Sequence, residues 1–319
     1  MNVEFFTDRP TWLAWRRDRL GSSDIAGVLG VSRWSSPRSV WADKLGLLDD
    51  DDRVESDKMR YGRYAEKMFD DWFADETGMR LGQHQACVTH GNGWASASVD
   101  AFAFESTAYR STHDWWTVAL GVCEMKTEGI GRMWADDGVP DDYWAQIQWQ
   151  LHVTGAERGW FAVLHGWRFE LLEVARDEPH IAHMAEVAET FWRDHVLAGI
   201  PPATIGHPAD FDALTAQFPT HDEGVEAVLD PTIWNLYRLA LAQAKDVDAN
   251  VARHRAALAA QLGDAEYGTV NGVRVCTFRT SDVRRIPTGR LPGWVRYRFG
   301  ETQQVRTLRV SAADKKGKK

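Results

Sequence analysis

The spacing of apolar residues in the first 80 positions predicts helices. Apolar side chains recur at helical intervals over 11–20, and after a break at Gly21 a second helix is expected to begin near Asp24. A longer amphipathic helix is predicted over 59–78. Glu66 falls on or beside the apolar face of that helix, and a carboxylate there needs a partner, a cation or a cleft because its unpaired burial is costly.

The following stretch alternates between short apolar segments and further helices. Strands are predicted at 86–89, 95–102, 115–120 and 121–126, a hairpin at 160–164 and 168–174, and helices at 140–153 and 180–197. Strands interleaved with helices indicate an α/β class with a central mixed β-sheet flanked by helices. We expect this first domain to span 1–205.

The last third of the chain has a different pattern. Residues 206–230 are rich in Pro, Asp, His and Thr, which predicts a linker. One long helix is expected over 234–262, followed by short strands at 269–278, 294–299 and 304–310. The region 231–310 is therefore interpreted as a small C-terminal α+β appendix, and 311–319 as a disordered basic tail.

Charge is distributed unevenly along the chain. The net charge of the 319 residues is −9, but residues 268–319 contain thirteen Arg or Lys and three Asp or Glu, a net +10 that leaves −19 for the remainder. A basic arm on an acidic body suggests contact with a polyanion, although a charged tail also serves as a solubilising end. No run approaches the roughly 18 apolar residues of a membrane span, and the first residues lack a signal-peptide pattern. We expect a cytoplasmic protein.

The cysteines do not form a recognisable binding or disulfide motif. Cys87, Cys123 and Cys276 are far apart and odd in number, with no C-x-x-C spacing. Neither a disulfide framework nor a zinc or iron–sulfur site is expected. They are predicted to be core residues of a protein in a reducing compartment.

The candidate chemistry lies on two of the predicted strands. Asp100 follows an apolar strand, and Glu124-Met125-Lys126 occupies a second. Alternation along a strand puts Glu124 and Lys126 on one face and Met125 on the other. Two carboxylates with the Met125 backbone carbonyl form a donor set for Mg²⁺, with Mn²⁺ as an alternative, and a nearby lysine can orient or deprotonate an attacking water. The pattern favours phosphodiester hydrolysis, although E-x-K alone is a weak signal.

Further motifs accompany this pair in a fixed order. They are Trp12-Leu13 with Arg16 before Gly21-Ser22-Ser23-Asp24-Ile25-Ala26, Leu29-Gly30-Val31-Ser32, Ser36-Pro37, Trp41-Ala42-Asp43-Lys44-Leu45-Gly46, Met59-Arg60-Tyr61-Gly62-Arg63-Tyr64-Ala65-Glu66, Val99-Asp100, Glu124-Met125-Lys126, and Tyr143-Trp144-Ala145-Gln146-Ile147-Gln148-Trp149-Gln150-Leu151-His152-Val153-Thr154-Gly155. Together they resemble the YqaJ-like viral recombinase family, which includes the lambda-type phage alkaline exonucleases of the PD-(D/E)xK nuclease superfamily. The resemblance covers about the first 200 residues and implies that superfamily's restriction-endonuclease-like core.

The resemblance also implies roles for individual residues. Asp100 and Glu124 would bind the catalytic metal with Glu66 completing the site, Lys126 would act on the water, and Gln146 would steady the lysine and the scissile phosphate. Arg16 and Ser23, seven residues apart, would bind a terminal 5′-phosphate, in line with the N–H groups that a helix starting at Ser23 or Asp24 would offer. An ordinary N-cap is the alternative explanation for that serine and aspartate. Gln148 is a further candidate for DNA contact, because only alignment distinguishes it from Gln146.

The expected activity is metal-dependent 5′-to-3′ degradation of linear double-stranded DNA from 5′-phosphorylated ends, which leaves 3′ single-stranded overhangs. The sequence departs from the family pattern at Ala65, where a larger aliphatic residue is usual, and after Asp100, where a glycine often follows. The alternatives are another PD-(D/E)xK endonuclease or a non-catalytic DNA-binding phage protein. For the basic appendix, the choices are DNA binding, assembly into a homo-oligomeric ring and docking of a single-strand annealing protein.

Overall fold

The computed structural model describes residues 2–48, 57–106, 115–128, 133–285 and 301–310. The chain divides into two units, Met1–His221 and Asp222–Lys319. The strand predicted at 294–299 and the tail 311–319 lie outside the described residues. In the described ranges, no helix has both the length and the apolar character needed to cross a membrane.

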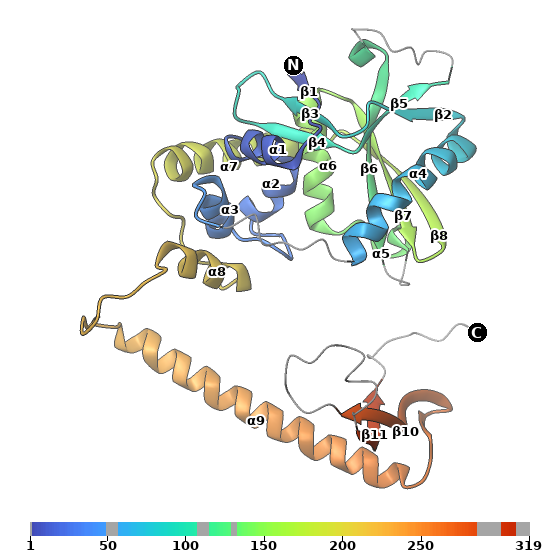
Figure 1. Cartoon of the computed structure of the whole chain (residues 1–319), viewed down its shortest axis with the longest axis vertical. Coiled ribbons are helices and arrows are strands. Elements are labelled where there is room, and N and C mark those ends of the chain that lie inside the picture. Colours follow the sequence, from blue (N-terminus) through green and yellow to red (C-terminus); the bar gives the residue numbers. More distant parts are fainter. Residues whose placement is uncertain (1, 49–56, 107–114, 129–132, 286–300, 311–319) are drawn as a thin grey trace. The chain divides into compact units, whose positions relative to one another are not determined.

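The first unit is built on two sheets (Figure 1). A five-stranded sheet has the order β2-β5-β6-β7-β8, in which β6 and β7 run parallel and the other neighbours antiparallel. Its strands are β2 (Met79–Gly82), β5 (Ala101–Glu105), β6 (Ala119–Glu128), β7 (Arg158–His165) and β8 (Arg168–Ala175). A three-stranded antiparallel sheet contains β1 (Asn2–Glu4), β3 (Ala86–Thr89) and β4 (Ser96–Val99). The mixed α/β architecture predicted from the sequence is confirmed.

Helices cover both faces of the five-stranded sheet. The helices described in the first unit are α1 (Arg9–Arg17), α2 (Ser22–Val28), α3 (Pro37–Lys44), α4 (Asp57–Thr77), α5 (Trp134–Asp137), α6 (Asp141–Thr154), α7 (Glu178–Phe191), which continues as a π-helical turn (Trp192–Leu197), and α8 (Pro208–Gln217). Val122 of β6 packs in a core shared with α2 and α6, whereas Cys123 packs in a second core with Phe69 and Phe73 of α4. The alternation along β6 therefore separates an α6 face from an α4 face.

The strand predicted over 95–102 is two strands that belong to different sheets. β4 pairs with β3 in the small sheet, and β5 pairs with β2 and β6 in the large one. Asp100 is the residue between them. Its position is thus fixed by both sheets at the point where the chain passes from one to the other.

A glycine allows β6 and β7 to approach. A Cβ atom on Gly121 would lie 2.1 Å from the carbonyl oxygen of Arg158 and 2.9 Å from the ring of Trp160. No side chain fits at that distance. Gly121 therefore keeps the parallel pair closed a few residues before the E-x-K positions.

Two predictions for this unit are wrong. Residues 115–117 form a 3₁₀ turn, and β6 begins only at Ala119. Part of the predicted linker is the helix α8, which packs on α3 with Ala213 fully buried. Asp210 explains why the helix forms, because its carboxylate accepts backbone N–H bonds from Ile205, Gly206 and His207 at its N-terminus.

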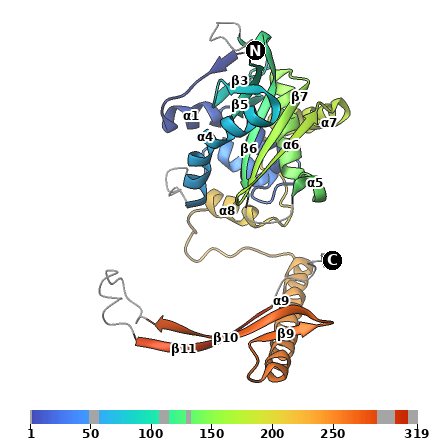
Figure 2. The same cartoon turned by 90° about the vertical axis from the view of Figure 1, so that its right-hand side faces the viewer.

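The second unit contains one long helix and a three-stranded antiparallel sheet (Figure 2). Its elements are α9 (Pro231–Leu262), β9 (Tyr267–Val270), β10 (Val273–Arg285) and β11 (Glu301–Val310). The single segment predicted over 269–278 is a hairpin whose turn residues Asn271 and Gly272 both have positive φ. That pair is the usual signature of a tight hairpin turn. No described side chain of α9 is buried, and all but those of Ala259 and Leu262 are exposed.

Candidate active site

Glu124 and Lys126 share the α6 face of β6, as their alternation predicts. Lys126 Nζ lies 2.5 Å from Glu124 Oε1, and Glu124 is 2% exposed. Met125 points to the opposite face and packs against the core of α4. Burial alone would lower the pKa of Lys126, but the charges of Glu124 and Asp100 raise it above its ordinary value. The ammonium is therefore charged in the resting site.

Gln146 completes a triangle with these two residues. Its Nε2 donates to Glu124 Oε1 at 2.6 Å, and its Oε1 accepts from Lys126 Nζ at 3.1 Å. The glutamine comes from α6, which begins with Asp141 and Asp142 in its first turn and ends at Gly155 in the left-handed conformation. The structure thus brings Gln146 to the position that the resemblance implies.

The Asp100 carboxylate lies beside this cluster and repels the carboxylate of Glu124. The backbone N–H of Met125 donates to Asp100 Oδ2 at 2.8 Å, which links the switch between the sheets to β6. Burial and then the negative charge of Glu124 raise the pKa of Asp100 to about 7, against the opposing effect of Lys126. Two carboxylates with incompletely balanced charge therefore meet at one place.

Glu66 approaches the same place from the other side of the sheet. It lies on α4, is partly exposed, and its charge is among the causes that raise the pKa of Asp100. Glu66 also acts electrostatically on His84, which lies 3.2 Å from Asp70. The sequence signal for Glu66, a carboxylate near an apolar helix face, thus corresponds to a position near the acidic cluster.

Arg16 and Ser23 lie at the junction of α1 and α2. Arg16 Nη2 is 2.6 Å from Asp24 Oδ1, and the fully buried ammonium of Lys44 is 2.6 Å from Asp24 Oδ2. Burial alone would raise the pKa of Asp24, but the charges of Arg16 and Lys44 hold it well below its usual range. Ser23 is exposed in the first turn of α2, next to this anchored pair.

Strand β4 connects the α1–α2 junction with the acidic cluster. Leu20 forms a parallel bridge with Ala95, just before β4, and Asp100 follows the other end of the strand. Five residues of extended chain span about 16 Å. The structure thus fixes the path from Arg16 and Ser23 to the carboxylates without bringing the two groups into contact.

Gln148 is not part of the cluster. Its side chain is fully buried, its Nε2 donates to the carbonyl of Ala175 at 2.9 Å, and its Oε1 accepts from the N–H of Asp177 at 2.9 Å. Both halves of the amide serve the junction between β8 and α7. We therefore correct the interpretation of Gln148 as a DNA-binding residue, since helix geometry turns it away from Gln146.

Sequence reasoning missed two residues that touch the cluster. Gln150 Nε2 donates to Glu124 Oε2 at 2.5 Å. Tyr143 places its ring 4.6 Å from Lys126 Nζ and donates its hydroxyl to Glu128. The signal was the spacing of four residues from Gln146 to Gln150 and of three from Tyr143 to Gln146, which puts all of them on one helix face.

The donor set fits a hard divalent cation by its chemistry. Among the described side chains, no three carboxylate, imidazole or thiol groups are arranged as a metal cluster. Asp100 and Glu124 nevertheless provide two neighbouring carboxylates, and burial together with their mutual repulsion raises the pKa of Asp100. A cation bound by oxygen ligands would offset that repulsion. The metal site therefore stays a prediction with a physical reason in its favour.

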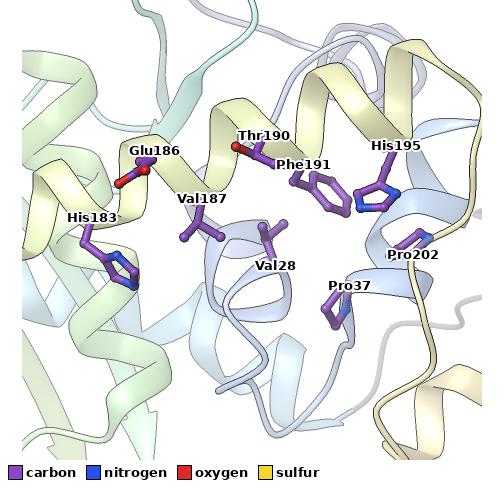
Figure 3. A pocket seen from close by; sticks show the side chains of 9 residues that line it. All are labelled: Val28, Pro37, His183, Glu186, Val187, Thr190, Phe191, His195 and Pro202. Carbon is purple, nitrogen blue, oxygen red and sulfur yellow. The ribbon is translucent and has the colours of Figure 1, made fainter.

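A separate pocket of about 350 Å³ lies between α2, α3 and α7 (Figure 3). It is lined on one side by Val187, Phe191 and His195 and on the other by Val28 and Pro37. None of its lining residues belongs to the acidic cluster. The chemistry of the site therefore does not extend to this pocket.

Sequence comparison finds a family match within the first unit. The YqaJ-like viral recombinase domain matches residues 11–157. This region is therefore similar to a YqaJ-like viral recombinase domain. It contains Arg16, Glu66, Asp100 and the E-x-K strand, and it ends just after α6.

Similar proteins include one close in length and others known from crystal structures. The YqaJ protein of Bacillus subtilis (strain 168) is 27% identical over 279 residues, which cover 84% of this chain and 82% of that protein. LHK-Exo, an alkaline exonuclease from Laribacter hongkongensis, is 19% identical with a TM-score of 0.45 over 60% of this chain and 94% of its own. A phage-related exonuclease from Haemophilus somnus 129PT is 9% identical with a TM-score of 0.39 over 57% and 96%.

Proposed function

We propose that this protein is a metal-dependent exonuclease that degrades linear double-stranded DNA from 5′-phosphorylated ends in the 5′-to-3′ direction and leaves 3′ overhangs. The observation that carries the proposal is the bonded cluster of Glu124, Lys126 and Gln146 beside Asp100, inside a region similar to a YqaJ-like viral recombinase domain.

In this proposal, Asp100, Glu124, the Met125 carbonyl and Glu66 would hold Mg²⁺ or Mn²⁺. The cation would supply an activated water and polarise a phosphate oxygen. Lys126 carries a positive charge beside the carboxylates, so its ammonium donates toward the water and offsets negative charge that develops on phosphorus. Gln146 keeps that ammonium in place, because one amide group bonds both Lys126 and Glu124.

The 5′ preference would come from Arg16 and Ser23. Arg16 is held by Asp24, so its guanidinium is pre-oriented when a terminal phosphate arrives. The exposed Ser23 hydroxyl stands in the adjacent helical turn. A single-strand annealing protein as partner and a homo-oligomeric ring as assembly belong to the same proposal and rest on the family resemblance alone.

The deciding test compares linear and circular duplex DNA with and without Mg²⁺. Wild-type protein should shorten linear duplex in Mg²⁺, spare closed circles and be inactive in EDTA. Lys126→Ala should remove the activity while the protein stays folded, whereas Lys67→Ala, at an exposed lysine of α4, should leave it unchanged. Nicking of circles at a comparable rate would indicate an endonuclease, and DNA binding without metal-dependent cleavage would indicate a non-catalytic protein.

A further inference from the structure

Gln150 occupies the centre of the site without any access to solvent. Its side chain is fully buried on α6, one turn after Gln146. Its Nε2 donates to Glu124 Oε2 at 2.5 Å and, more weakly, to the carbonyl of Ser98 at 3.4 Å. Ser98 lies on β4, two residues before Asp100. One amide group therefore bridges β6 and the strand that leads to Asp100.

The two oxygens of Glu124 have different partners. Oε1 accepts from Lys126 and Gln146, which are both partly exposed. Oε2 accepts from the buried Gln150. A carboxylate held through one oxygen can still rotate about its last bond, whereas one held through both cannot. Gln150 thus fixes the orientation of Glu124 even when Lys126 and Gln146 turn toward a substrate.

The orientation of the Gln150 amide is determined by its surroundings. A flipped amide would set its carbonyl oxygen against the carboxylate oxygen of Glu124, which is repulsive. In the observed orientation, Gln150 Oε1 is buried and accepts no hydrogen bond from the described residues. An unmade bond at a buried oxygen is destabilising. Packing alone does not explain a glutamine here, because an apolar side chain of the same length would avoid that loss.

Gln148 provides the contrast on the same helix. It is equally buried, but both of its amide atoms bond to the backbone at Ala175 and Asp177. Its hydrogen bonds are fully explained by the fold. Those of Gln150 end on a carboxylate of the site and leave one oxygen unpaired.

We infer that Gln150 is a positioning residue that fixes the Glu124 carboxylate for cation binding. The inference rests on the proposed function, since it assumes that Glu124 is a metal ligand. Partners that orient metal-binding side chains typically change metal affinity 10–100-fold when they are removed. This role predicts that substitution of Gln150 lowers the cation affinity more than substitution of Gln148, an equally buried glutamine on the same helix.

The test measures Ca²⁺ binding to the full chain by calorimetry. Gln150→Met replaces the amide by an apolar side chain of similar length, and Gln148→Met is the matched control. We expect Gln150→Met to weaken Ca²⁺ binding at least ten-fold and Gln148→Met to change it by less than about two-fold, even where its melting temperature falls further. The Mg²⁺ concentration for half-maximal DNA degradation should rise for Gln150→Met and stay constant for the control.

The outcomes separate the two proposals. If the wild-type protein degrades DNA and binds Ca²⁺, and Gln150→Met binds Ca²⁺ equally well, the role of Gln150 is overturned while the proposed function stands. Equal weakening by both substitutions also overturns it, because the effect is then one of stability. Wild-type protein that neither binds Ca²⁺ nor degrades DNA overturns the proposed function together with this inference. If Gln150→Met does not fold, Gln150→Asn, which keeps the amide but shortens its reach, should weaken binding to a smaller degree.

Discussion

Asp100→Asn is expected to stabilise the metal-free protein at alkaline pH while it abolishes DNA degradation. In the folded protein, burial and the charge of Glu124 raise the pKa of Asp100 from 3.8 to about 7. A carboxyl group whose pKa is raised on folding contributes stability below about pH 4, and this contribution is lost as the pH rises toward 7. Asparagine carries no charge at any pH, so it avoids that loss and still offers an oxygen to the Met125 N–H.

The size of the expected gain in stability follows from the pKa shift of Asp100. Roughly three pKa units at about 1.4 kcal/mol each set an upper limit of about 4 kcal/mol above pH 7. Asp100 is partly exposed and Lys126 is adjacent, so solvent screening reduces the value to about 1–3 kcal/mol. The gain should be smaller at pH 5 than at pH 8.

Urea denaturation in EDTA, followed by tryptophan fluorescence, measures this difference. Fourteen of the 16 tryptophans lie within residues 1–221, so the signal reports the unit that contains the site. Asp24→Asn is the matched control, because Asp24 is a buried carboxylate whose pKa is instead held low by the charges of Arg16 and Lys44. Its substitution removes the nearer of the two carboxylates beside the buried Lys44 ammonium, at 2.6 Å, and leaves only that of Asp43 at 3.4 Å, so it should cost up to about 3–5 kcal/mol at pH 8.

The reasoning fails if Asp100→Asn destabilises the protein equally at pH 5 and pH 8. That result would mean that the carboxylate is stabilised in place, and the repulsion inferred from its surroundings would be absent. Addition of Mg²⁺ gives an independent check, since it should stabilise the wild type more than the variant.

Two further predictions concern DNA ends and charge. Arg16→Ala should equalise degradation rates on 5′-phosphorylated and 5′-hydroxyl duplexes, mainly by slowing the former; end-labelled substrates measure this, and an unchanged preference would exclude Arg16 from end recognition. Removal of residues 222–319, the unit that contains the +10 basic stretch, should weaken duplex binding and make its affinity fall less steeply with salt; a folded truncation that keeps both the affinity and the salt slope would show that the basic stretch does not bind DNA.

The sequence predicted the site best where one element determines the geometry. The alternation of Glu124, Met125 and Lys126 follows from strand geometry alone, and the structure confirms it. The choice between Gln146 and Gln148 depends on how α6 is rotated against β6, which tertiary packing decides. Gln150 was missed for the same reason, although its spacing from Gln146 placed both on one face.

The predicted boundaries of helices and strands were wrong where composition was given more weight than local capping and turn residues. The segment over 206–230 has the composition of a linker, yet it contains Pro208 in the first helical turn and Asp210 as the acceptor for three backbone N–H groups. Those residues are typical of a helix start. The Asn271-Gly272 pair similarly indicated a hairpin within a segment interpreted as one strand.

The passage of the chain from one sheet to the other at Asp100 has a consequence for folding kinetics. β3 and β4 can pair locally, but Asp100 reaches Glu124 only after β5 has also docked on β6. The pairing of β6 with β7 must in turn wait for α6 to close the parallel connection between them, which is a slower type of contact than a hairpin. We therefore expect the two carboxylates of the proposed cation site to come together late in refolding, after most of the secondary structure has formed.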